Sequence, residues 1–142
     1  LMHEELQKNM QQNVGIIRTD SELKTGIENI ENLKNDYINV KANGSSQFNP
    51  GWHEALGMRN LLITAEAVAR AAYLRTESRG AHTRDDFPKE STEWYRYNII
   101  IKKGADNKMQ VNKEERKEAD LELKRIANSK LEDLEQEVLN ER

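Results

Sequence analysis

Apolar residues recur three or four positions apart through residues 2–77, which is the spacing that lines one face of an α-helix. The pattern divides into three helices, over residues 2–13, 19–42 and 50–77. Thr19, three residues before Glu22, predicts a capping box at the start of the second helix, and Asn49 before Pro50 predicts the start of the third. Apolar residues extend around the third helix, so we expect it to lie at the centre of the fold, with Ala69 allowing a close neighbour.

The helical spacing stops between Gly80 and Asn112, and Pro88 prevents easy continuation of the third helix. Residues 94–101 are typical of a short strand, and the turn at residues 104–107 predicts a small hairpin over residues 94–111. Residues 113–142 return to helical spacing, which predicts a charged amphipathic helix whose apolar positions are Leu123, Ala127, Leu131, Leu134 and Val138.

The predicted fold is therefore all-α: a three-helix bundle with a short irregular or hairpin segment and an extra C-terminal amphipathic helix. We divide the chain into residues 1–112 and residues 113–142. A length of 142 residues suits one domain, and the 36% of hydrophobic residues predicts a thin core. The chain starts Leu1-Met2-His3, so we expect it to be a fragment of a longer protein.

Composition excludes several classes of function. The net charge of −3 provides no general attraction for a nucleic-acid backbone, so we expect no nucleic-acid partner. The absence of cysteine excludes disulfides and thiolate metal sites within the chain. No apolar run approaches the roughly 20 residues of a membrane span, and we expect a cytoplasmic chain.

Motifs for catalysis or cofactor binding are absent from the sequence. The seven glycines form neither a dinucleotide fingerprint nor a phosphate loop, the three histidines lack the spacing of a zinc site, and no serine stands in a nucleophile elbow. We therefore predict no catalytic, cofactor-binding or metal-ligating residue in this chain, and a self-contained hydrolase is disfavoured.

Three arginines, one histidine and three carboxylates lie close together where the third helix ends, over residues 75–88. Gly80 can adopt the positive φ that often closes a helix. In one interpretation Arg79 and Arg84 pair locally with Glu77, Asp85 or Asp86, which makes the segment a helix cap followed by a solvated turn. In the other, Arg75, Arg79 and Arg84 reach toward another domain or an anionic ligand. The spacing of the charged residues alone favours neither interpretation.

Residues 75–88, R-T-E-S-R-G-A-H-T-R-D-D-F-P, resemble the signature near the C-terminus of succinate dehydrogenase and fumarate reductase flavoprotein subunits. Residues 10–18 resemble that family's M-x-x-x-V-G-I-x-R segment, and residues 56–75 resemble its long helix. The resemblance covers roughly residues 6–100. L-aspartate oxidases carry a similar E-S-R-G-x-H segment and are the close alternative. The charged helix over residues 113–142 is not a feature that we associate with the family.

The resemblance implies a spectrin-repeat-like bundle that supports the FAD domain of an enzyme interconverting succinate and fumarate. In that family the flavin site and the groups that handle the dicarboxylate lie upstream, so this chain is expected to be non-catalytic, with FAD bound by the parent subunit. The implied partners are the FAD-binding domain of the same chain and an iron-sulfur subunit, in a complex peripheral on the inner face of the membrane. The expected interdomain seam consists of Arg75, Glu77, Ser78, Arg79, Gly80, His82, Arg84 and Asp85.

An alternative from another class is an independent helical interaction module. Its terminal helix would use the apolar stripe to bind a partner helix, including a second copy of the chain. Self-association through this helix is therefore a further expectation.

Overall fold

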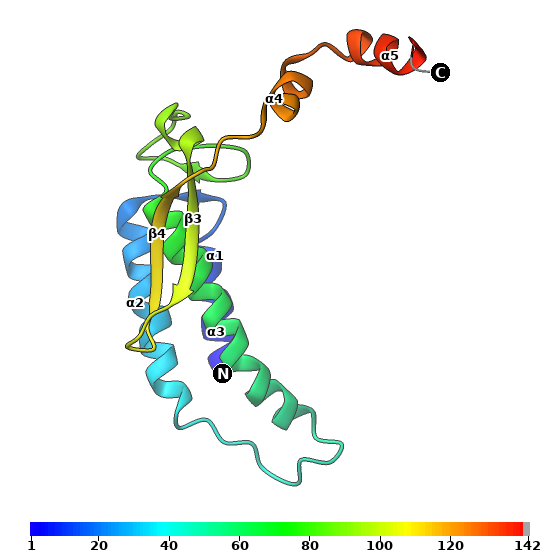
Figure 1. Cartoon of the computed structure of the whole chain (residues 1–142). Helices are drawn as coiled ribbons and strands as arrows, with labels where there is room; N and C mark the ends of the chain where they lie inside the picture. Colours follow the sequence, from blue (N-terminus) through cyan, green and yellow to red (C-terminus); the bar gives the residue numbers. More distant parts are fainter. Residues whose placement is uncertain (141–142) are drawn as a thin grey trace.

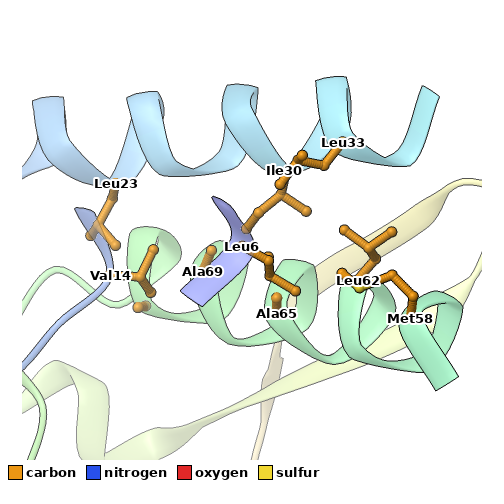
Figure 2. Packing of buried hydrophobic residues seen from close by; sticks show 10 residues of the cluster. Leu6, Val14, Leu23, Ile30, Leu33, Met58, Leu62, Ala65 and Ala69 are labelled. Atoms are coloured by element: carbon orange, nitrogen blue, oxygen red, sulfur yellow. The ribbon is translucent and has the colours of Figure 1, made fainter. Parts of the chain in front are cut away.

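The computed structural model describes residues 1–140, in which three long helices lie side by side (Figure 1). They are α1 (Met2–Asn13), α2 (Asp20–Tyr37) and α3 (Pro50–Leu74). Leu23, Ile30 and Leu33 of α2 face the buried side of α3, and α1 adds Leu6 to the same core (Figure 2). The core residues on α3 are Met58, Leu62, Ala65, Ala69 and Ala72. The core therefore lies among α1, α2 and α3, as the helical spacing predicts.

The two predicted helix starts are confirmed. The backbone N–H of Glu22 donates to Thr19 Oγ1 (3.3 Å), and the N–H of Thr19 donates to Glu22 Oε2 (2.9 Å), which completes the capping box of α2. The N–H of Trp52 donates to Asn49 Oδ1 (3.2 Å), with Pro50 in the first turn of α3.

Helices α2 and α3 both end earlier than predicted. Helix α2 stops at Tyr37 rather than residue 42, and Ile38 beyond it is exposed, so a longer helix would gain no packing. Helix α3 stops at Leu74 rather than residue 77. The carbonyl oxygens of Ala72 and Tyr73, near its C-terminal end, accept hydrogen bonds from the side chain of Arg84.

Helices α1 and α2 approach closely at Gly26, a contact that the apolar pattern does not reveal. A Cβ atom at Gly26 would lie 2.9 Å from Val14 Cγ2. The buried Asn9 side chain donates from Nδ2 to the Gly26 carbonyl oxygen (2.9 Å). A larger residue at position 26 would therefore push α1 away from α2.

The expectation of an all-α fold is wrong in detail, because the mostly helical chain also contains two small sheets. Strands β1 (Ile17–Arg18) and β2 (Thr83–Arg84) form a two-residue parallel pair. Strands β3 (Tyr97–Lys103) and β4 (Met109–Glu115) form an antiparallel hairpin that lies along α2 and α3 (Figure 1). The hairpin starts later and ends later than the predicted residues 94–111, because a 3-10 turn (Glu93–Arg96) buries Trp94 before β3 begins.

The prediction of one helix over residues 113–142 is also wrong. Strand β4 continues to Glu115, so the division after residue 112 falls inside a strand. Two short helices follow, α4 (Leu121–Asn128) and α5 (Leu131–Asn140), and the last two residues of the predicted helix lie outside the described residues. The backbone leaves helical geometry at Ser129, which separates α4 from α5.

We call residues 1–115 the body and residues 116–140 the arm. The arm extends away from the body at the end of β4 (Figure 1), and neither α4 nor α5 contains a buried residue. Among residues 1–140, no helix has both the length and the apolar character of a membrane span.

Candidate functional site

The densest ionic cluster of the chain lies in residues 75–91, which we call the 75–91 loop. It follows α3 and lies at the same end of the molecule as β1 and the start of the arm (Figure 1). Asp85 N–H donates to the Arg18 carbonyl oxygen (2.9 Å), and Asp20 N–H donates to Asp86 Oδ2 (3.1 Å). The loop therefore joins the end of α3 to the connection between α1 and α2.

Arg84 closes the C-terminal end of α3. Its fully buried guanidinium donates to the carbonyl oxygens of Ala72 (3.2 Å) and Tyr73 (3.1 Å). It also donates twice to the Asp86 carboxylate (2.8 and 2.6 Å), whose pKa is lowered by these bonds. A cation at this position satisfies carbonyls that lack helical partners and interacts favourably with the helix dipole. This contact explains why α3 ends where it does.

Glu77 is the second fully buried ionic group of the loop. Arg79 binds its carboxylate with two bonds (3.1 and 2.9 Å), Arg75 donates to Oε1 (2.7 Å), and the Ser91 N–H donates to Oε2 (2.9 Å). The bonds from Arg79 outweigh the effect of burial and, with the Ser91 amide and the Arg75 charge, lower the pKa of Glu77 to about 2. Glu77 is therefore ionised across the physiological pH range.

The Arg79 guanidinium contacts residues of the 75–91 loop and the nearby Tyr95 ring. Besides Glu77, it donates to Glu90 Oε2 (3.2 Å) and to the Ser91 carbonyl oxygen (3.1 Å). Its guanidinium lies 3.7 Å from the centre of the Tyr95 ring, a cation–π distance. Hydrogen bonds to Glu77 raise the pKa of Arg79, so the side chain keeps its charge.

His82 is held in its neutral form. Arg18 donates from a guanidinium nitrogen to His82 Nδ1 (2.8 Å), which leaves the proton on Nε2, where it donates to the Arg75 carbonyl oxygen (3.0 Å). Burial lowers the pKa of His82, and the charges of Arg18 and Arg84 act in the same direction. The residue therefore joins β1 to the end of α3 and serves as a structural hydrogen-bonding group.

Ser78, Gly80 and Asp85 complete the predicted set. Ser78 Oγ accepts from the Arg84 N–H (2.8 Å) and lies 2.9 Å from the Phe87 carbonyl oxygen, which holds the loop closed. Gly80 has the predicted positive φ (+57°), but it lies in the turn that pairs Arg79 with His82, beyond the end of α3. Asp85 is exposed and takes part through its backbone.

The local-pairing interpretation accounts for the observed contacts of Arg79 and Arg84. The predicted partners Glu77 and Asp86 are used, whereas Asp85 is not. Sequence reasoning missed that Arg18, 64 residues away, meets His82, and that the Ser91 amide completes the shell of Glu77. The only signal for Arg18 was its place in a segment that resembles the same family.

The buried polar groups of the cluster are fully paired. Within the described part of the chain, every buried side-chain nitrogen or oxygen has a hydrogen-bond partner, and no group of three potential metal ligands occurs. Neither a nucleophile with an adjacent base nor an unpaired cationic cradle is present in the 75–91 loop. Chemically, the arrangement fixes the shape of one end of the body.

Apolar surface is exposed beside this ionic cluster and along α3. Ile16 and Ile17 are 79% and 65% exposed, and Ile17 is in register with Thr83. On α3, Leu61 and Val68 are 45% and 43% exposed and lie seven residues apart, on one face of the helix. The expectation that α3 is central is confirmed, because α3 contacts α1, α2, β3 and β4. Leu61 and Val68 lie on the part of its surface that these elements leave exposed.

Comparison with known proteins identifies the family. The family model described as "Fumarate reductase flavoprotein C-term" matches residues 3–134. The chain belongs to this family. The resemblance predicted from residues 75–88 is thereby confirmed, and the match extends into α5, so the arm is part of the flavoprotein C-terminal domain.

Relatives of known sequence agree with this assignment. An uncharacterized FAD-dependent oxidoreductase of Methanocaldococcus jannaschii is 40% identical over 99 residues, which are 70% of this chain and 17% of the relative. A fumarate reductase (CoM/CoB) subunit of Methanothermobacter marburgensis is 35% identical over 102 residues, 72% of this chain and 19% of the relative. The chain thus spans less than a fifth of the length of these relatives.

A solved structure shows the same fold. The model matches Sdh1 of Mycobacterium smegmatis in complex with UQ1, with a TM-score of 0.82 and 37% identity over 94% of this chain and 23% of the Sdh1 chain. Residues 1–115 alone cannot account for that share of a 142-residue chain, so the superposition includes part of the arm.

Proposed function

We propose that this chain is the C-terminal helical domain of an FAD-dependent flavoprotein subunit that interconverts succinate and fumarate. Its role is to support the flavin-binding part of the same subunit. The observation that carries the proposal is the family match over residues 3–134, together with relatives of which the aligned residues make up only 17% and 19%.

The proposed architecture is a spectrin-repeat-like unit of α1, α2 and α3, followed by the hairpin and the arm. We place the functional boundary after Glu115, in preference to residue 112, because β4 belongs to the hairpin of the body. FAD is assigned to the rest of the subunit, because the family places the flavin site upstream of this domain and because Arg79 and Arg84 are bound to Glu77 and Asp86. When bound there, FAD would supply the hydride-transfer chemistry of the subunit.

The proposed seam with the flavin-binding part is formed by the 75–91 loop together with Ile16 and Ile17. Arg75, Glu77, Ser78, Arg79, Gly80, His82, Arg84 and Asp85 shape it. Because Arg84 is fully buried, we assign it a positioning role, in which it holds the loop against α3. The exposed Ile16 and Ile17 provide the apolar contact area that a stable domain interface needs.

In the complete complex, we propose that the flavoprotein lies peripherally on the inner face of the membrane, where it passes electrons to an iron-sulfur subunit. These assignments rest on the family. L-aspartate oxidase, the alternative raised by the E-S-R-G-x-H segment, is less favoured because Sdh1 and the matched fumarate reductase belong to the dehydrogenase and reductase branch.

The first experiment is to isolate the native protein that carries this sequence, then measure its mass and visible absorbance. A chain several times 16.5 kDa with a flavin spectrum is expected. A colourless native chain of about this mass would contradict the proposal and favour the independent interaction module.

The seam is tested with Arg79→Ala in the full flavoprotein subunit. Removing Arg79 leaves the buried Glu77 without its bidentate partner, so the loop loses its shape and FAD retention falls. FAD content after gel filtration is the readout. The matched control is Arg96→Ala on the hairpin, where the ion pair with Glu115 is exposed. Equal FAD retention in both variants and in the wild type would rule out the seam.

A further inference from the structure

The arm presents apolar side chains that nothing in the described chain covers. Leu121 of α4 and Leu131 of α5 are 85% and 68% exposed. On α5, Leu131, Leu134 and Val138 follow helical spacing and form one stripe. An amphipathic helix without a partner gains little stability from its stripe, so these residues indicate a binding surface.

The arm has internal order despite its exposure. Asp120 Oδ1 accepts from the Leu123 N–H (2.8 Å) and caps α4. Arg125 of α4 donates to both oxygens of Glu137 on α5 (2.7 and 3.0 Å) and pairs with Glu122 of its own helix (2.9 Å). These bonds connect the two helices across the break at Ser129, so α4 and α5 can act as one unit.

The charges of α5 define the chemistry of its partner. The described residues of α5 carry four acidic side chains and no basic one. The acidic residues are Glu132, Asp133, Glu135 and Glu137. A surface that accepts this helix therefore combines an apolar groove for Leu131, Leu134 and Val138 with a rim of lysine or arginine.

One such groove exists on the body, but its position does not suit the arm of the same chain. A cavity of about 660 Å³ lies between α2, α3 and the hairpin turn, with Leu62 and Ile101 among its apolar residues and Arg59, Lys103 and Lys108 among its cations. It lies at the turn of the hairpin, whereas the arm leaves from the opposite end of β4, roughly 20 Å away for a seven-residue strand. The arm would have to reverse direction to reach it.

We propose that the arm docks on the flavin-binding part of the same subunit, through α5 in an apolar groove with a basic rim. This inference rests on the proposed function. The arm begins at Arg116, whose guanidinium donates to the Tyr95 carbonyl oxygen (3.0 Å), and the Tyr95 ring lies against Arg79 of the 75–91 loop. The arm therefore leaves the body beside the proposed seam (Figure 1). In Sdh1, the matched segment is 23% of a longer chain, and the match includes part of the arm.

The test is photo-crosslinking in the full flavoprotein subunit, with p-benzoylphenylalanine in place of Leu134. The matched control carries the same residue in place of Glu132, which lies off the apolar stripe of the same helix. After irradiation, the cross-linked peptides are mapped by mass spectrometry. The proposal expects a cross-link from position 134 to the flavin-binding part of the same chain, with little product from position 132.

Other outcomes would overturn the proposal. A cross-link to Arg59, Ile101 or Lys108 of the same chain would show that the arm folds back onto the body. A product of twice the subunit mass would assign the arm to self-association, and a cross-link to a different protein of the complex would assign it to that protein. Absence of any product from position 134 would also contradict docking.

A second measurement uses Leu134→Asp in the same subunit. Loss of docking exposes the arm, so trypsin should cleave after Lys130 about tenfold faster than in the wild type. FAD content at the start of the assay separates the two proposals. A subunit that contains FAD but shows no change in cleavage contradicts the arm assignment alone, whereas a native protein without FAD contradicts the proposed function.

Discussion

The body and the arm carry the same kind of amphipathic pattern, but only the body buries it. Leu23 and Ile30 of α2 are fully buried against α1 and α3, whereas the leucines at the start of α4 and α5 lie in solvent. Ionic groups differ in the same way. Arg84 and Glu77 are buried with complete sets of partners, whereas the Arg125–Glu137 pair of the arm is exposed. The comparison shows that periodicity predicts a helix and its apolar face, but does not identify the surface that covers this face.

The sharpest way to test the difference in ionic groups is to remove one buried cation. Arg84→Leu leaves the carbonyls of Ala72 and Tyr73 and the Asp86 carboxylate without their donor. We expect a loss of about 3–5 kcal/mol in the free energy of unfolding, measured by urea denaturation followed by circular dichroism. Arg125→Leu is the control and should leave the midpoint unchanged. Equal midpoints for both variants would contradict a structural role for Arg84.

The same truncation in the body and in the arm compares apolar burial directly. Leu23→Ala creates a cavity in the core and should cost about 2–5 kcal/mol of unfolding free energy. Leu131→Ala should leave the urea midpoint of the 142-residue chain unchanged, because its side chain is already in water. A matching loss for Leu131→Ala would show that the arm packs on its own body.

Adding volume tests how closely α2 and α3 approach. Ala69 is fully buried between them, and Ala69→Leu should cost about 1–3 kcal/mol through overpacking. Ala127→Leu, at an exposed position of α4, is the control and should be neutral. Thermal unfolding of both variants provides the comparison. An unchanged melting temperature for Ala69→Leu would mean that the interface has unused space.

The smallest expected effect is a pH dependence at His82. Because the folded-state pKa of His82 is lowered from its ordinary value of 6.5, its contribution to stability is complete above about pH 6.5. This contribution is lost as the pH falls from there through the lower folded-state pKa. Glu77, with a pKa of about 2, contributes fully above its ordinary 4.5 and loses its contribution only below that value.

Urea midpoints of the wild type and His82→Gln, measured from about pH 5 to about pH 8, isolate this effect. The wild type should lose stability relative to the variant toward the acidic end of this range. Parallel profiles would show that His82 does not titrate differently on folding.

Much of the body was predictable from local signals. Thr19 with Glu22 and Asn49 with Pro50 marked the helix starts, because a cap depends on residues only three positions apart. Residues 75–88 of the 75–91 loop were also singled out, whereas Glu90 and Ser91, which bind Arg79 and Glu77, were not. Their partners were only partly predictable, since the contact of Arg18 with His82 joins residues 64 positions apart and depends on the tertiary fold.

Errors in prediction occurred where a long-range contact decides the outcome. Helix α3 ends at Leu74 because Arg84 returns to bind its carbonyls. The 3-10 turn at Trp94 forms where the indole N–H reaches Thr76 Oγ1 (3.2 Å). Residues 113–115 have helical spacing but pair with β3, because strand pairing depends on the partner as well as on the sequence itself.

The short β1–β2 pair also has a consequence for the order of folding. It joins residues 17–18 to residues 83–84, and the segment between them contains all of α2 and α3. Contacts within that helical hairpin close shorter loops than the strand pair does. We therefore expect α2 and α3 to associate first and the strand pair, with Arg18 and His82, to close last. Substitutions there should accelerate unfolding while leaving the refolding rate nearly unchanged.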